Sequence, residues 1–146
     1  ARDEQAGVAN TAHLRALIEN LPRTGTPETP RPGPLAIYAG NDRIICRDIA
    51  MRKFIIPAEE TRVVTRIRAG EDIVGELRRK IASTIEEGRE FVSNPAAWGL
   101  EAVAAWEAMG ANGKIVVIER DERLLAIATV NVELAGGYWS SAFRSA

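Results

Sequence analysis

The chain has 146 residues, 46% of them hydrophobic, which is enough for one domain with a buried core. Its 19 Lys and Arg against 20 Asp and Glu leave a formal charge of -1, so we expect neither nucleic acid nor a membrane surface as a partner. One cysteine, Cys46, and one histidine, His13, exclude an internal disulfide and are too few for a zinc site, so no metal is expected. The absence of a long apolar run and the polar start ARDEQAGVAN predict a cytoplasmic location.

Residues 1–21 are predicted to contain an N-terminal docking helix. Asn10 or Thr11 can cap a helix in which Leu14, Leu17, Ile18 and Leu21 recur at helical spacing, before Pro22 ends it. Residues 22–34, PRTGTPETPRPGP, hold five of the seven prolines and predict an extended linker. The helix before this linker can pack on the body of the chain or on another chain.

Residues 35–146 are predicted to form one α/β domain. It starts with short β-rich runs broken by Gly-Asn-Asp, which indicate a small antiparallel meander. A helix closed by Gly88 follows, because Ile73, Leu77, Ile81 and Ile85 are spaced by four.

The second part of this domain predicts parallel strands joined by helices. A brief strand lies at Phe91 and Val92, followed by a helix with Asn94 as N-cap and Pro95 at its first position, ending at Gly110. A buried strand then spans Lys114 to Ile118, and Asp121 caps a helix that Gly136–Gly137 end. Alternating strands and helices predict a parallel sheet with right-handed crossovers.

From about Leu35 onward, the chain resembles the FkbM-type family of S-adenosylmethionine-dependent methyltransferases. In that family, the first strand and turn read roughly V-D-V-G-A-N-x-G, and the second strand ends G-x-V-x-A-x-E-P. Here the same interval reads VSNPAAWG (92–99) and then KIVVIERD (114–121). The resemblance implies that Glu119 accepts hydrogen bonds from the cofactor ribose and that Asn131 matches the asparagine of the next helix. The expected fold is therefore a β meander followed by a truncated Rossmann-like, methyltransferase-type β-α-β-α unit, with an N-terminal helix and a Pro-rich linker.

The glycine-rich turn of the family is changed where cofactor binding needs it. Ser93 stands in the acidic position, and Trp98 precedes Gly99, which is the one glycine left in the turn. Pro95 fixes φ and removes a backbone donor, and a tryptophan can fill the space of a cofactor. We therefore expect S-adenosylmethionine binding to be lost, with no catalytic residue. If a cofactor is bound, Glu119, Asn94 and Gly99 would line its site.

Three tryptophans are the other candidate residues. Trp98 and Trp106 are eight residues apart, which predicts one helix face, and with Trp139 they are interpreted as interface anchors. The tail YWSSAFRSA (138–146) would be a further contact segment. Other polar groups are interpreted as surface charge, namely Asp42, Asp48, Glu59, Glu60, Glu71 and Asp72, and the Arg78–Lys80 run.

The sequence leaves three functional readings. The first is a non-catalytic methyltransferase-like domain that acts in assembly or protein binding, with a protein partner or a homo-oligomer, because the sheet is short and its edges are unpaired. The second is a working S-adenosylmethionine-dependent methyltransferase, or a fragment completed by another chain. The third is a subunit of an unrelated α/β assembly.

Overall fold

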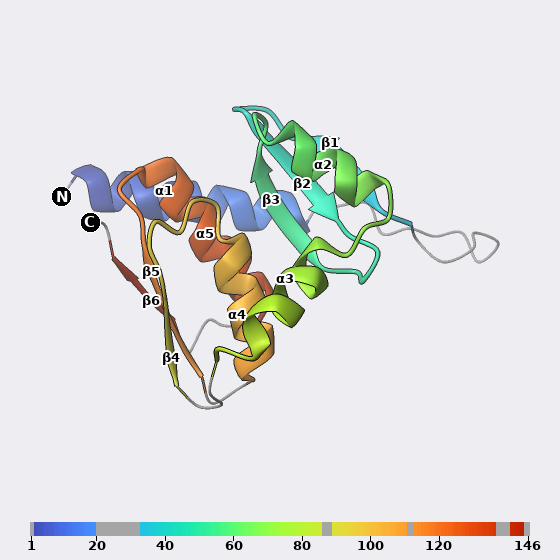
Figure 1. Cartoon of the computed structure of the whole chain (residues 1–146). Coiled ribbons are helices and arrows are strands. Elements are labelled where there is room, and N and C mark those ends of the chain that lie inside the picture. The colour runs from blue at the N-terminus through green and yellow to red at the C-terminus, as the bar shows by residue number, and fades with distance from the viewer. Residues whose placement is uncertain (1, 20–32, 86–88, 111–112, 137–140, 145–146) are drawn as a thin grey trace.

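The described residues form two three-stranded sheets with helices packed between and around them (Figure 1). The computed structural model describes residues 2–19, 33–85, 89–110, 113–136 and 141–144. In chain order the elements are α1 (Arg2–Glu19), β1 (Leu35–Tyr38), β2 (Arg43–Arg47), β3 (Lys53–Pro57), α2 (Thr61–Arg68), α3 (Ile73–Ala82), β4 (Glu90–Ser93), α4 (Leu100–Met109), β5 (Lys114–Ile118), α5 (Glu122–Leu134) and β6 (Ser141–Arg144). The chain is thus a mixed α/β protein.

The first sheet is the predicted antiparallel meander, in the order β1-β2-β3. Its first turn uses the Gly-Asn-Asp signal, because Gly40, Asn41 and Asp42 all have positive φ. α2 then packs on this sheet through the buried Val64 and Ile67. α2 was not predicted, because its apolar residues, Val63, Val64 and Ile67, are all β-branched and favour strands.

The second sheet is parallel, in the order β4-β5-β6. β4 and β5 confirm the strands predicted at Phe91–Val92 and at 114–118. β6 lies within the segment predicted as a contact tail and instead pairs with β5 of the same chain, with Ile115 opposite Ser141. Trp139 and the preceding Tyr138 lie outside the described residues.

Several helices begin or end at other residues than predicted. α1 begins at Arg2, so Asn10 and Thr11 lie inside the helix and not at its start, while Leu21 and Pro22 fall outside the described residues. α3 stops at Ala82, before Ile85, because the Thr84 backbone N–H and hydroxyl both donate to the Ile81 carbonyl (2.9 and 2.8 Å). Asp121 is the N-cap of α5, as predicted.

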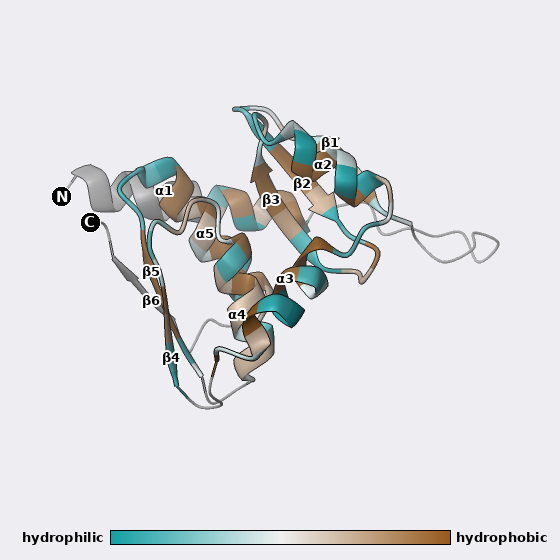
Figure 2. Ribbon diagram, in the orientation of Figure 1, coloured by the Kyte–Doolittle hydropathy of each residue, from teal (hydrophilic) through white to brown (hydrophobic). Residues whose placement is uncertain are grey.

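α4 and α5 lie between the two sheets (Figure 1), and α5 contacts both β3 and β5. α1 packs on α5 and β3: Leu14 and Ile18 are buried, and Arg15 forms a two-pronged ion pair with Glu133. Apolar residues follow the strands and the inner helix faces, while the outer faces of α2 and α3 are polar (Figure 2). No described helix has the length and apolar character to cross a membrane.

Candidate functional site

The turn 94–99 between β4 and α4 lies at the carboxyl end of the parallel strands, where open α/β sheets bind ligands. Asn94 and Pro95 are exposed and joined by a cis peptide bond. α4 begins at Leu100 with Gly99 as N-cap, so the prediction that Asn94 caps it and Pro95 starts it is wrong. The turn is longer because the Ala96 N–H donates to the Ile118 carbonyl (2.9 Å) and ties the chain to β5 before the helix can start.

Glu119 follows β5 directly and faces this turn. Its Oε1 accepts from the Ala97 N–H (2.9 Å) and its Oε2 accepts from the Asp121 N–H (2.9 Å). The residue is 7% exposed. Both carboxylate oxygens of Glu119, the predicted ribose-binding residue, therefore accept hydrogen bonds from the backbone of the chain. One bond is in the β4–α4 turn and the other is at the start of α5.

Asn131 of α5 binds three backbone groups in two segments that are far apart in sequence. Its Oδ1 accepts from the Ile55 N–H (2.8 Å), and its Nδ2 donates to the carbonyls of Ile55 (2.8 Å) and Trp98 (2.7 Å). The first two bonds satisfy the backbone groups of Ile55 on the outer edge of β3, and the third holds the β4–α4 turn at Trp98. Asn131 thus connects β3 of the antiparallel sheet to the β4–α4 turn.

Gly99, the last residue of the turn, lies against Ala128 of α5. Its φ of 96° lies in the left-handed region, and a Cβ there would be 2.9 Å from the Cα of Ala128. This glycine therefore allows a close approach between the turn and α5, which is a packing role within the chain.

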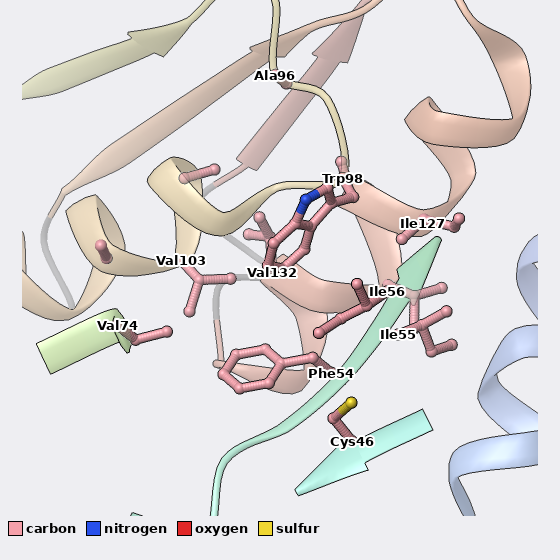
Figure 3. Packing of buried hydrophobic residues seen from close by; sticks show 14 of the residues in the cluster. Cys46, Phe54, Ile55, Ile56, Val74, Ala96, Trp98, Val103, Ile127 and Val132 are labelled. Atoms are coloured by element: carbon pink, nitrogen blue, oxygen red, sulfur yellow. The ribbon is translucent and has the colours of Figure 1, made fainter. Parts of the chain in front are cut away.

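Trp98 and Trp106 do not share a helix face, because Trp98 precedes α4. The Trp98 side chain is 5% exposed and points toward Phe54 and Ile56 in the core (Figure 3). Trp106 is half-buried, and its Nε1 donates to the Ala135 carbonyl (2.9 Å), which holds the end of α5. Trp98 therefore packs within its own chain, and Trp139 lies outside the described residues.

Groups able to do chemistry are sparse around this turn. The Ser93 hydroxyl is buried and has no hydrogen-bond partner. Cys46 is fully buried in β2, and burial raises the pKa of its thiol to about 12, which disfavours a reactive thiolate. His13 is exposed on α1. Across the described ranges, no three His, Cys, Asp or Glu side chains are placed to hold a metal ion.

A second polar cluster, which the sequence analysis missed, joins the β2–β3 turn to α3 and α4. The Arg52 Nη1 donates to Asp48 (3.0 Å) and Asp72 (2.6 Å), and its Nε donates to Glu107 (2.7 Å). Burial alone would lower the pKa of Arg52, but these hydrogen bonds, that of Glu107 first, raise it.

This cluster corrects the interpretation of Asp48 and Asp72 as surface charge. Asp48 is fully buried, and Asp72 is the N-cap of α3, where it accepts from the Gly75 N–H (2.8 Å). The position of Asp72 just before the apolar spacing of α3 is an N-cap signal that could have been found. The four-residue spacing of Asp48 and Arg52 across a turn carries no comparable signal.

Comparison with protein-family models, with curated proteins and with solved structures finds no match to this chain.

Proposed function

We propose that this chain is a non-catalytic, methyltransferase-like domain that works in assembly or protein binding. The proposal combines the resemblance of residues 92–131 to the FkbM-type family with the way the family's cofactor positions are used here. The Rossmann-like character of the parallel unit is part of the proposal, and the β4-β5-β6 strand order with α4 and α5 on one side supports it.

The observation that carries the proposal is the hydrogen bonding of Glu119. A ribose-binding carboxylate needs oxygens that ligand hydroxyls can reach, whereas both Glu119 oxygens here accept backbone N–H groups in a nearly buried position. Gly99 and Trp98 support the same conclusion, because they bring α5 and the core against the turn where the family binds its cofactor. A cofactor would have to displace these contacts.

The edge of β4 is the surface that best supports an assembly role. Among the described strands, β4 pairs only with β5, so the backbone groups on its other side have no strand partner. Val92, in the middle of β4, is 47% exposed. An open strand edge with an exposed β-branched residue is a template for pairing with another chain.

Calorimetric titration with S-adenosylmethionine and S-adenosylhomocysteine tests the proposal. We expect no binding heat at millimolar ligand. We also expect Glu119→Ala to lower the free energy of unfolding by about 2 kcal/mol, because the N–H groups of Ala97 and Asp121 lose a charged acceptor. The matched control is Glu101→Ala, at an exposed carboxylate in the first turn of α4, which should change stability by less than about 1 kcal/mol.

Micromolar binding of either ligand that disappears in Glu119→Ala would instead establish the methyltransferase reading. That reading has one point in its favour: Glu119 does lie at the end of β5 beside the β4–α4 turn. Binding that survives Glu119→Ala would reject both the non-catalytic proposal and Glu119 as the ribose ligand.

A further inference from the structure

A cavity of about 300 Å³ lies between the β2–β3 turn, β3, α4 and α5. Two of its most buried lining residues are apolar, since Phe54 of β3 and Val103 of α4 are each 1% exposed. Met51 and Leu134 also line it, but they are 48% and 37% exposed and mark its mouth. A volume of this size lies at the lower end of the range for small-molecule sites. The cavity therefore has room for a small ligand with an apolar body.

The β2–β3 turn holds one side of this apolar mouth. Met51 has a φ of 67°, in the left-handed region that residues with a Cβ rarely adopt, and its N–H donates to the Asp48 carbonyl (3.0 Å). The side chain of Met51 is left exposed beside the cavity. A methionine adapts to ligands of different shape, because its side chain is unbranched and flexible. A ligand that covers Met51 and Leu134 would remove their apolar surface from water.

Arg52 supplies a free hydrogen-bond donor to the wall of the cavity. Its Nε and Nη1 donate to Glu107, Asp48 and Asp72, but its Nη2 makes no hydrogen bond within the described residues. The Arg52 side chain is 15% exposed, and its Nη2 is not sealed from solvent. The amide of Asn131, which also lines the cavity, already donates to two carbonyls. The Nη2 of Arg52 is therefore the donor that is left for an oxygen atom of a ligand.

The charges around the cavity favour an uncharged ligand. Arg52 already faces three carboxylates, so these would repel a ligand anion at Nη2. The carboxylate of Glu107 is bound to the Arg52 Nε (2.7 Å), which weakens its attraction for a ligand cation. Lys53, the remaining charged residue of the lining, is exposed, so its ammonium group can stay in water. An ionised ligand would thus lose hydration without gaining an unpaired counter-charge.

We propose that this cavity, which we call the Arg52 cavity, binds a small uncharged organic molecule. The apolar body of the ligand packs against Phe54 and Val103, and Met51 and Leu134 cover it at the mouth. A carbonyl or hydroxyl oxygen of the ligand accepts a hydrogen bond from the Nη2 of Arg52. The Arg52 cavity is separate from the β4–α4 turn and from the β4 edge, so the site stands whether or not the proposed function holds.

The test follows the methyl signals of the two methionines by nuclear magnetic resonance while the full chain is titrated with acetophenone. This probe joins an aromatic ring to a ketone oxygen and has no charge. Met51 reports on the mouth, and Met109, which is 2% exposed and packs against Gly113, is the internal control. We expect a saturable shift of the Met51 signal alone, with a dissociation constant in the millimolar range. No saturable shift of Met51, or equal shifts of both signals, would overturn the proposal.

Two charged analogues test the class of ligand. Benzoate and benzylamine carry the same ring with an anionic or a cationic group, and ionic strength is held constant with sodium chloride. We expect each of them to shift the Met51 signal with an affinity at least about tenfold below that of acetophenone, because the charged group loses hydration. Equal or tighter binding of either analogue would reject an uncharged ligand and identify an acid or an amine in its place.

Arg52→Lys tests the hydrogen-bond donor. Lysine keeps the positive charge for the three carboxylates but has no Nη2, so we expect acetophenone to bind at least about fivefold more weakly. The matched control is Arg79→Lys, at an exposed arginine whose charge acts on Asp72 but which does not line the cavity. This control should bind acetophenone as the wild type does. Unchanged binding in Arg52→Lys would reject Arg52 as the donor.

Leu134→Ala covers the case in which Arg52→Lys does not fold. Leu134 is the last residue of α5 and is partly exposed, so this change leaves the core intact. We expect it to weaken acetophenone binding about threefold or more, because the ligand loses apolar contact at the mouth. Ile49→Ala, at an exposed apolar residue of the β2–β3 turn that does not line the cavity, is the control and should bind normally. Unchanged binding in Leu134→Ala would place acetophenone outside the Arg52 cavity and reject the site.

Discussion

Asn131 has three hydrogen bonds to main-chain groups of two separate segments, and it is 1% exposed. A side-chain amide that replaces backbone pairing in this way cannot be exchanged for an apolar group without leaving buried donors and acceptors unpaired. Glu119 has the same kind of role at the β4–α4 turn. Asn131 and Glu119, the two polar residues that the sequence resemblance singled out, therefore stabilise the backbone of this chain.

The first prediction concerns the Asn131→Ala substitution. It leaves the Ile55 N–H and the carbonyls of Ile55 and Trp98 without their partner, so we expect the free energy of unfolding to fall by about 3 kcal/mol or more. Urea unfolding measures the change. The control is Thr129→Ala on the same helix, because its hydroxyl bonds only the Leu125 carbonyl of the previous turn and its loss should cost less than about 1 kcal/mol. Similar losses in the two variants would contradict the role given to Asn131.

Among the contacts between elements, Arg52 joins the turn after β2 to α3 and α4 through three carboxylates. Asp72 has two tasks here, as N-cap of α3 and as a partner of Arg52. Burial would raise the pKa of Asp72, but the Gly75 N–H and the Arg52 charge together lower it below the ordinary value of 3.8. Stabilisation from this ionised carboxyl is therefore present above pH 3.8 and is lost as the pH falls through the lower pKa of the folded state.

The second prediction uses Asp72→Asn, which keeps an N-capping acceptor for Gly75 and removes the charge. At neutral pH, we expect this variant to be less stable than the wild type by on the order of 1 kcal/mol. The difference should shrink as the pH falls below 3.8, because the wild-type carboxyl then becomes neutral as well. Urea unfolding of both proteins across acidic pH measures it. A difference that stays constant over this range would show that the Arg52 cluster does not depend on the Asp72 charge.

Elements with local signals could be predicted from the sequence, and those set by distant contacts could not. Asp121 before an apolar-periodic run predicted the start of α5, because an N-cap acts on its own first turn. The start of α4 was wrong because the Ala96 bond to Ile118 of β5 decides it, and a bond between segments 22 residues apart leaves no local pattern. For the same reason, the sequence showed that Glu119 and Asn131 are polar residues in defined places but not that backbone groups are their partners.

The two sheets differ in whether the backbone groups on their outer edges have hydrogen-bond partners. The outer edge of β3 is blocked at Ile55 by Asn131, so this edge does not present a continuous row of free groups. β4 has no such cover among the described residues, and Glu90 at its start pairs only with Lys114 of the adjacent strand (3.4 Å). The parallel sheet therefore offers the more open edge, and an assembly role would use this side of the molecule.

The last prediction tests this edge through the mass of the native particle. If the chain forms a homo-oligomer, we expect a mass above that of one chain, and Val92→Lys should shift it toward the single chain, because a lysine on an edge strand disfavours pairing with a second strand. Tyr38→Lys is the matched control, since Tyr38 is also exposed and ends β1, the outer strand of the other sheet; it should leave the mass unchanged. A shift in the Tyr38 variant alone would move the contact to the antiparallel sheet. A single-chain mass for the wild type at high concentration would exclude the homo-oligomer, and a different protein would then be the partner of the β4 edge.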